Sequence, residues 1–284
     1  MNLQPTVNEW RDQPTPPTTP MREAIGSLLY EFRWLASDTA MMTWRNLMHY
    51  RRNPETLAST IAGPVMFLLL FNYVFGGAIG AGRDFNYIDY LVPGILIQNN
   101  LFTVMNTGIG IAQDLQKGFV DRYRSLPMAR SAVLGGRVCA TTLVSFASVY
   151  WTLAIALIFG MRFHGGLVPA LILPLVVAAF CFAFAWVSAL VGVSVRNAET
   201  ASSSTFFVAI PLTFLSSTFV PIETMPGWLQ AFAEVNPITH VVNLCRNLAQ
   251  GGPLESYAWV TAFWIALMVI GIGSLATWRY RRIS

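Results

Sequence analysis

Charged side chains are rare in this sequence, but one short stretch gathers several of them. It contains two aspartates, one lysine and four arginines: Asp114, Lys117, Asp121, Arg122, Arg124, Arg130 and Arg137. Guanidinium and carboxylate groups can form charge-assisted hydrogen bonds with another protein, and the aromatic residues Phe119 and Tyr123 between them can add apolar contact. We therefore interpret residues 114–137 as a docking element for a second protein.

Nucleotide binding is a chemistry that the sequence does not support. A P-loop needs a lysine followed by serine or threonine, and Lys117, the only lysine of the chain, is followed by Gly118. The three cysteines, Cys139, Cys181 and Cys245, and the three histidines are scattered, without the spacing of a metal site or of a nucleophile beside a base. We expect no catalytic residue, no metal and no cofactor in this chain, so any energy must come from another subunit.

The composition indicates where such a docking element would sit. The chain is 54% hydrophobic and only 11% charged, against about 25% charged residues in soluble proteins, which is typical of an integral membrane protein. Its apolar runs are continuous, unlike the alternating strands of a membrane barrel. We predict an all-α integral membrane protein whose residues 53–284 form one domain of six spans. The charge-free intervals, each exceeding the roughly 20 residues that a span needs, are 56–82, 90–113, 138–161, 167–195, 200–222 and 256–278.

Basic residues predict the orientation of these spans. They are concentrated before the first interval, between the second and third, and after the sixth, whereas the connections on the other side hold one arginine each, at Arg83, Arg162 and Arg246. The positive-inside rule then places both termini and residues 114–137 in the cytoplasm. A simpler alternative is that the arginines of this loop only fix the orientation, which leaves Phe119 and Tyr123 unexplained.

Three segments outside the spans have their own character. Residues 1–20 are rich in proline and threonine and carry no secretion signal, so we expect a disordered tail. In residues 21–52, apolar side chains recur at helical spacing, which predicts an amphipathic interfacial helix that anchors the first span or also transmits force. Residues 221–250 are broken by prolines into pieces too short to span, which predicts an external re-entrant helical element that either gates the outer side or only caps the bundle.

Several polar residues lie within the second and fifth intervals. Amides and hydroxyls in a bilayer need partners, so they either line a cavity suited to a bulky amphipathic solute or hydrogen-bond to neighbouring helices. Asn99 and Asn106 are seven residues apart and should share a helix face with Phe102. With the aromatic residues beside them, the candidates are Gln98, Asn99, Phe102, Asn106, Phe206, Thr213, Ser216 and Ser217.

Two motifs resemble a known family. KGFVDRYRSLP at residues 117–127 and MPGWLQAFAEVNPITHVVNLCR at residues 225–246, together with the six spans, resemble type-2 ABC transporter permeases, most closely the daunorubicin-resistance permease group. The resemblance runs from about Trp44 to the C-terminus and omits the proline-rich tail.

The resemblance implies a role for each motif. It implies that the 114–137 loop couples to a separate ATP-binding subunit, through Gly118, Phe119, Asp121, Arg122, Arg124, Leu126 and Pro127. It implies an external gate within residues 221–250, where the candidates are Pro226, Trp228, Asn236 and Pro237. Spans two and five of two permease chains would line a central pathway with alternating access. Two ATP-binding chains would carry the ATP and Mg, and the complex would lie in the bacterial inner membrane.

We therefore expect a permease of an ATP-driven exporter for a hydrophobic or amphipathic drug or lipid, with membrane lipid as a further partner and no nucleic acid. An exporter of polysaccharide is the alternative within the family. An intramembrane enzyme would need a nucleophile with a base or a metal cluster, which the spans do not offer. A purely structural membrane subunit is the remaining alternative, and it would associate with no ATP-binding protein.

Overall fold

The computed structural model describes residues 20–53, 55, 62–71, 73–74, 87–118, 130–195 and 197–283. Within these ranges all regular structure is helical, which confirms the all-α prediction. In chain order the elements are α1 (Pro20–Arg52), α3 (Tyr87–Gln116), α5 (Arg130–Ile158), α6 (Leu167–Ser194), α7 (Ala198–Phe214), the 3-10 turn η1 (Ile222–Thr224), α8 (Gly227–Val235), α9 (Pro237–Gln250), α10 (Glu255–Ala266), the π-helical turn η2 (Leu267–Ile272) and α11 (Gly273–Ile283). The predicted tail, apart from Pro20 at the start of α1, lies outside the described residues.

Three stretches of the described chain are long and apolar enough to cross a membrane: Ser131–Ile158, Leu167–Ser194 and Glu255–Arg282. They coincide with the third, fourth and sixth predicted spans. The second predicted span lies in α3, a 30-residue helix that carries several amides, and the fifth lies in α7, which has 17 residues. The first is described in part, as the short apolar helix Ala62–Phe71 and residues 73–74. By length and composition the chain is thus a multi-pass protein, and the number of six spans stays a prediction.

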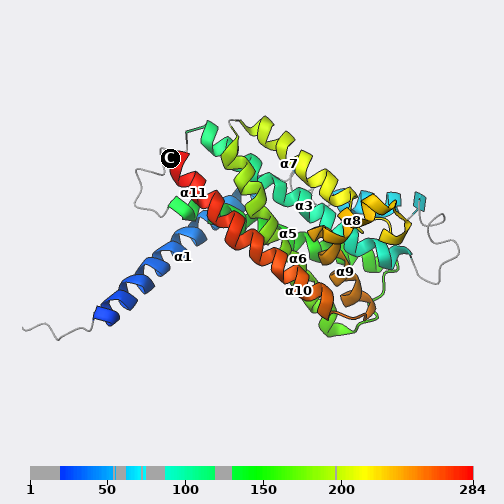
Figure 1. The fold of residues 1–284 in the computed structure, drawn as a ribbon. Coiled ribbons are helices and arrows are strands. Elements are labelled where there is room, and N and C mark those ends of the chain that lie inside the picture. Colours follow the sequence, from blue (N-terminus) through cyan, green and yellow to red (C-terminus); the bar gives the residue numbers. More distant parts are fainter. Residues whose placement is uncertain are drawn as a thin grey trace, which may run out of the picture.

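The helices α3, α5 and α6 form the middle of the bundle. α6 packs against α3, α5, α9 and α11, while α7 packs on α3 and α1 packs mainly on α5. Figure 1 shows α1 projecting away from the bundle at the end where α11 finishes, with the short helices α8 and α9 at the opposite end. The end of α3 meets α1 and α5. The two sequence motifs therefore adjoin opposite ends of the molecule.

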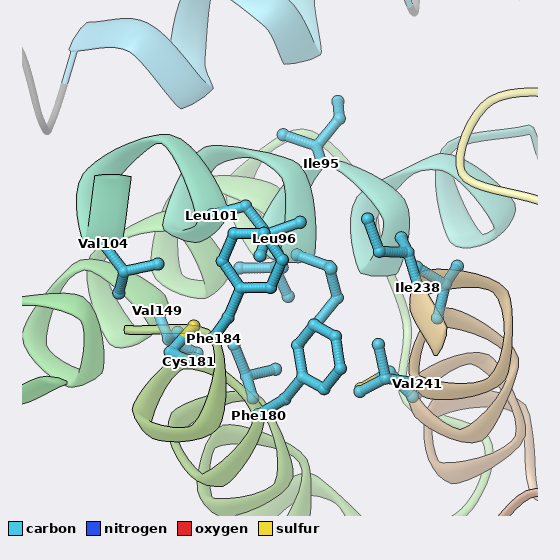
Figure 2. Close-up of a cluster of buried hydrophobic side chains, with 14 of the residues drawn as sticks. Ile95, Leu96, Leu101, Val104, Val149, Phe180, Cys181, Phe184, Ile238 and Val241 are labelled. Carbon is cyan, nitrogen blue, oxygen red and sulfur yellow. The ribbon is translucent and has the colours of Figure 1, made fainter. Parts of the chain in front are cut away.

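Aromatic side chains of α6 fill the centre of the core. The buried rings of Phe180 and Phe184 point toward Leu96 and Leu101 of α3, and Val241 of α9 closes the cluster (Figure 2). Dispersion between closely packed side chains holds such a core together, since lipid is as apolar as the side chains themselves. This packing fixes α3, whose polar residues are the candidates for the pathway, against α6 and α9.

Small residues let α3 and α6 cross in close contact. A Cβ atom on Gly108 would lie under 3.0 Å from the backbone oxygen of Ser188, and one on Gly192 would lie as close to the backbone of Gly108. The Ser188 hydroxyl accepts a hydrogen bond from Gly108 N at 3.0 Å and donates one to Met105 O at 2.9 Å. Glycine and serine are the residues that allow helix backbones to approach this closely in a membrane.

Candidate functional site

The first candidate site is the stretch that the sequence predicts to couple to a partner. α3 ends at Gln116, and the chain leaves it through Gly118, whose φ of 66° is the left-handed conformation common after a helix end. Gly118 N donates to Leu115 O at 3.2 Å. The other predicted coupling residues lie outside the described part of the chain; they are Phe119, Asp121, Arg122, Arg124, Leu126 and Pro127.

The two stems of this loop are joined by an ion pair. Arg137 Nη1 of α5 donates to Asp114 Oδ2 of α3 at 2.8 Å, and both side chains are about one-fifth exposed, at 22% and 20%. The guanidinium lies against Gly110, where any Cβ atom would overlap it. Thr141 Oγ1, one turn further along α5, donates to Arg137 O and accepts from Thr107 Oγ1, each at 3.0 Å. The loop therefore begins and ends on two helices that an ion pair and a hydrogen bond between side chains join.

The second candidate site is a stripe along α3. Between Leu91 and Ala112, every residue is buried except Asn99, Phe102, Asn106 and Ile109. Their spacing of three and four residues places them on one helix face. We call these four residues the α3 stripe. Three of its members are predicted pathway residues, and between Leu91 and Ala112 the stripe is the surface that the other described residues leave accessible.

The α3 stripe has neighbours on two other helices. Asn99 Nδ2 donates to Ser148 Oγ of α5 at 3.3 Å, and the rings of Phe102 and Phe206 of α7 lie 6.1 Å apart between centroids. Gln98, by contrast, points into the bundle, where its Nε2 has no hydrogen-bond partner among the described residues. The structure thus brings Asn99, Phe102 and Phe206 together and separates Gln98 from them. The role of these residues in a pathway stays a prediction.

The third candidate site is the corner where α7 ends. The predicted span continues to Ile222, but α7 stops at Phe214. Its last carbonyls are satisfied from outside the helix, because Asn236 Nδ2 donates to Leu212 O at 2.7 Å and to Leu215 O at 2.9 Å. Asn236 Oδ1 also accepts from Ile238 N at 2.9 Å. One side chain therefore caps the C-terminus of α7 and the N-terminus of α9.

Hydroxyl groups of the same corner, predicted as pathway candidates, are buried. Thr213 Oγ1 donates to Ala209 O at 2.8 Å, and Ser216 Oγ donates to Thr213 O at 2.6 Å. Ser217 Oγ donates to Asn243 Oδ1 of α9 at 2.9 Å. Local and interhelical hydrogen bonds thus account for these hydroxyls, which is the alternative that the sequence leaves open.

Arg246 organises this corner, although the sequence pattern alone indicates only a charge on an outer connection. Its side chain is 5% exposed. The Nη2 atom donates to the carbonyls of Ser217 and Thr218, and Nε donates to Tyr90 O at 2.9 Å. The guanidinium carbon lies 3.5 Å from the centroid of the Tyr90 ring, and Nη1 donates to Asn243 Oδ1 at 3.0 Å. The sequence does contain an indication of this role, because α9 carries a single arginine among apolar residues, and such a residue needs a buried partner.

The other predicted gate residues lie close to this corner. Pro226 precedes α8, and Pro237 is the first residue of α9 after its Asn236 cap, a position that proline favours. Trp228 of α8 is 75% exposed, and Phe232 and Val235 on the same short helix are also exposed. An apolar surface of this kind suits a bilayer or another protein. The re-entrant placement of α8 and α9 stays a prediction.

Comparison with known proteins connects these features. A family model described as ABC-2 type transporter matches residues 38–249. The chain is 32% identical to a daunorubicin resistance ABC transporter permease protein of Streptomyces coeruleorubidus, over 82% of this chain and 84% of the relative. It is 24% identical to a probable doxorubicin resistance ABC transporter permease protein of Mycobacterium tuberculosis, over 89% and 91%, and 23% identical to an inner membrane transport permease of Escherichia coli, over 79% and 86%.

The matched region contains the loop stems, the α3 stripe and the corner at the end of α7. It extends over most of the chain, and the relatives are matched over most of their own length. The family consists of membrane permease subunits of transporters rather than of catalytic enzymes. On the strength of the sequence match and the all-helical bundle together, the chain belongs to the ABC-2 type transporter family.

Proposed function

We propose that this chain is the transmembrane permease subunit of an ATP-driven ABC exporter. It moves a hydrophobic or amphipathic drug or lipid out of the cell, and a separate ATP-binding subunit supplies the energy. The match of the chain to ABC-2 permeases, two of them named for resistance to daunorubicin and to doxorubicin, is the observation that carries this proposal.

The ion pair between the two loop stems supports mechanical coupling between the ATP-binding subunit and helices α3 and α5. In the proposed complex, two ATP-binding chains carry the ATP and Mg, and each presses on one loop between residues 117 and 127. The Asp114–Arg137 ion pair at 2.8 Å joins the two helices that leave this loop. A push on the loop therefore moves α3 and α5 as one unit, and α3 bears the stripe of accessible residues.

The pathway is proposed to lie between two permease chains that alternate between inward and outward access. Each chain contributes the α3 stripe and the adjoining face of α7. On α7 the side chains of Phe207, Ile210 and Phe214 are exposed, with Phe207 at 80%, so this helix offers apolar surface to a second chain or to lipid. Aromatic rings beside the amides of Asn99 and Asn106 suit a solute with apolar and polar parts.

The orientation follows from the same proposal. We place both termini in the cytoplasm of a bacterial cell and the corner of α7, α8 and α9 on the outer side of the inner membrane. The separation of α1 and the end of α11 from α8 and α9, at opposite ends of the bundle in Figure 1, supports this arrangement.

Association with an ATP-binding subunit tests the proposal. The tagged full chain is purified from its own cells, and the eluate is assayed for an ATP-binding protein with ATPase activity. We expect such a protein to co-elute with the wild type and to be lost from the double variant Phe119→Ala/Arg122→Ala. Arg162→Ala removes the same charge from a connection predicted to be external and should retain the partner. Co-elution of no ATPase with any of these chains would contradict the proposal and favour a structural subunit.

A further inference from the structure

His240 lies at the end of the first turn of α9, on the side that faces α10. Its ring centroid is 6.4 Å from that of Tyr257 in the first turn of α10, with 44° between the ring planes, which is within the range of about 4.5–7 Å for aromatic contacts. α9 packs on α10 as well as on α6, α3 and α8, and Figure 1 shows α9 beside α10 at the end of the bundle remote from the C-terminus. The imidazole is therefore part of the contact between α9 and α10.

The same turn of α9 also holds the end of α7. Asn236 caps both helices, and Thr239 Oγ1, next to His240, accepts from Ser217 N at 3.3 Å. A displacement of this turn away from α10 would therefore loosen the corner at the end of α7 as well.

The site of the imidazole favours its neutral form. Nδ1 is buried and has no hydrogen-bond partner among the residues that the structure describes. In an imidazolium both ring nitrogens are donors, so the proton on Nδ1 would lose water without gaining an acceptor. His240 is also the fourth residue of α9, where the positive end of the helix dipole disfavours a cation.

The charged groups on the surrounding helices do little to stabilise an imidazolium. Glu234 of α8 and Glu255 of α10 are both exposed, so water screens their carboxylates. Asp89 of α3 is buried and accepts from a backbone N–H. Arg246, further along α9, is itself a cation, and the sequence of α6 contains no charged residue.

The pKa of His240 reflects these surroundings. Burial lowers this pKa from the ordinary value of 6.5, and the backbone carbonyl of Glu234 opposes the shift only in part. When the first turn of α9 opens, water solvates the imidazole and its pKa returns to about 6.5. The opened form then binds more protons than the closed form, so the closed form is fully stable above about pH 6.5 and loses stability as the pH falls below it.

We propose that His240 is a proton sensor in the contact between α9 and α10. Neutral His240 keeps the first turn of α9 packed on Tyr257, and its protonation in acid releases this turn and, with it, the end of α7. This inference rests on the proposed function only for the side of the membrane, since the proposed orientation places the sensor at the outer face of the cell. With the opposite orientation the same sensor would respond to acid in the cytoplasm.

Hydrogen exchange of the purified full chain in neutral detergent tests the sensor without any ATP-binding subunit. Protection factors of residues 215–218, 239–242 and 258–261 are compared at about pH 7.5 and about pH 5.5, with labelling times corrected for the intrinsic pH dependence of exchange. Carboxylates titrate near pH 4, so histidine is the side chain that responds in this window. We expect protection in the three segments to fall several-fold at the lower pH, with a ceiling of about tenfold because the opened-state pKa is about one unit above that pH.

Three variants separate His240 from other causes of a pH response. His240→Gln is neutral at both pH values and should lose the response. His240→Phe keeps an aromatic ring against Tyr257 and should lose the response too, even if the amide variant folds poorly. His164→Gln removes an exposed histidine of a connection predicted to be external and should retain the response.

Three results would overturn the inference. The first is equal protection of the wild type at both pH values. The second is a pH response that persists in both His240→Gln and His240→Phe. The third is loss of the response in His164→Gln as well, which would assign it to the histidine charge of the whole face. None of these results bears on association with an ATP-binding subunit, so the proposed function is tested independently.

Discussion

Replacement of Arg246 by methionine is expected to destabilise the corner between α7 and α9. Methionine has a similar length and an apolar end, but it cannot donate to the three carbonyl groups that the guanidinium now serves, at Tyr90, Ser217 and Thr218. A buried acceptor left unpaired costs about 1–3 kcal/mol. Ser217 O also accepts from the Tyr90 hydroxyl at 3.1 Å, so the substitution takes this donor only from the carbonyls of Tyr90 and Thr218 without replacement. The loss of the charge also removes the desolvation cost of a buried guanidinium, so the lower limit of about 1 kcal/mol for each of these two carbonyls is appropriate. The expected destabilisation is therefore about 2 kcal/mol.

Two measurements on the purified chain in detergent check this value. The thermal midpoint should fall by about 4 °C or more, at roughly 2–4 °C for each kcal/mol in a chain of this size, and amide hydrogen exchange should accelerate in residues 215–220. Arg246→Lys keeps the charge without the planar guanidinium group, so its thermal midpoint and exchange rates should lie between those of the wild type and of Arg246→Met. Arg279→Met changes an exposed arginine of α11 in the same way and should leave both readouts unchanged. If Arg246→Met matched this control in both midpoint and exchange, the corner would not depend on Arg246.

The remaining predictions concern helix packing, capping and the loop stems. Gly108→Ala should lower the free energy of unfolding by about 1–3 kcal/mol, because the added methyl group overpacks the crossing of α3 and α6. Gly271→Ala is the control, since its Cβ would lie 3.8 Å from the nearest atom, Leu267 Cδ1, and should not lower stability. Equal thermal midpoints of the two variants would refute the close crossing. Asn236→Ala removes both helix caps and should cost about 2 kcal/mol or more, with faster exchange at the end of α7 as the specific readout; unchanged exchange there would exclude a capping role. Asp114→Asn breaks a partly exposed ion pair, so it should change the free energy of unfolding by less than about 1 kcal/mol. It should nevertheless lower the drug-stimulated ATPase activity of the complex. Full stimulation would show that the ion pair does not transmit force.

The helices and the shared face of the α3 stripe follow from local patterns. Charge-free intervals predict apolar helices because a charge in the bilayer is costly, and α3, α5, α6, α7 and the run from α10 to α11 each overlap one interval. Asn99, Phe102 and Asn106 share a face because the geometry of a helix fixes the direction of residues three and four apart. Such inferences need no knowledge of the neighbouring helices.

The corner of α7 could not be predicted in the same way. Residues 215–222 are as free of charge as those before them. α7 nevertheless stops at Phe214, where Asn236 satisfies a carbonyl of its last turn and Arg246 satisfies the carbonyls of Ser217 and Thr218 just beyond it. The positive-inside rule assigns Arg246 to an outer connection because it counts charges without regard to burial. Long-range hydrogen bonds determine both the end of α7 and the burial of Arg246, and a hydropathy pattern does not predict such bonds.

A polar pocket lies where α1, α3 and α5 meet, next to Lys117 at the start of the coupling loop. The sequence alone does not predict this pocket. The basic residues near the end of α1 and those after α3 are both visible in the sequence, where each group supports the cytoplasmic orientation. Their convergence depends on the packing of α1 against α5, where Gly136 allows the backbone to approach Met42. Only the packed structure shows that Arg45, Arg52 and Lys117 line one pocket.

ATPase activity of the reconstituted complex shows whether this chain is the permease of an exporter for hydrophobic or amphipathic compounds. The permease and its ATP-binding subunit are reconstituted in liposomes, and ATP hydrolysis is measured against a series of hydrophobic and amphipathic drugs and lipids. The proposed function predicts saturable stimulation by at least one such compound, and loss of that stimulation in Arg122→Ala but not in Arg162→Ala. No stimulation by any of these compounds, together with stimulation by a lipid-linked glycan, would contradict it.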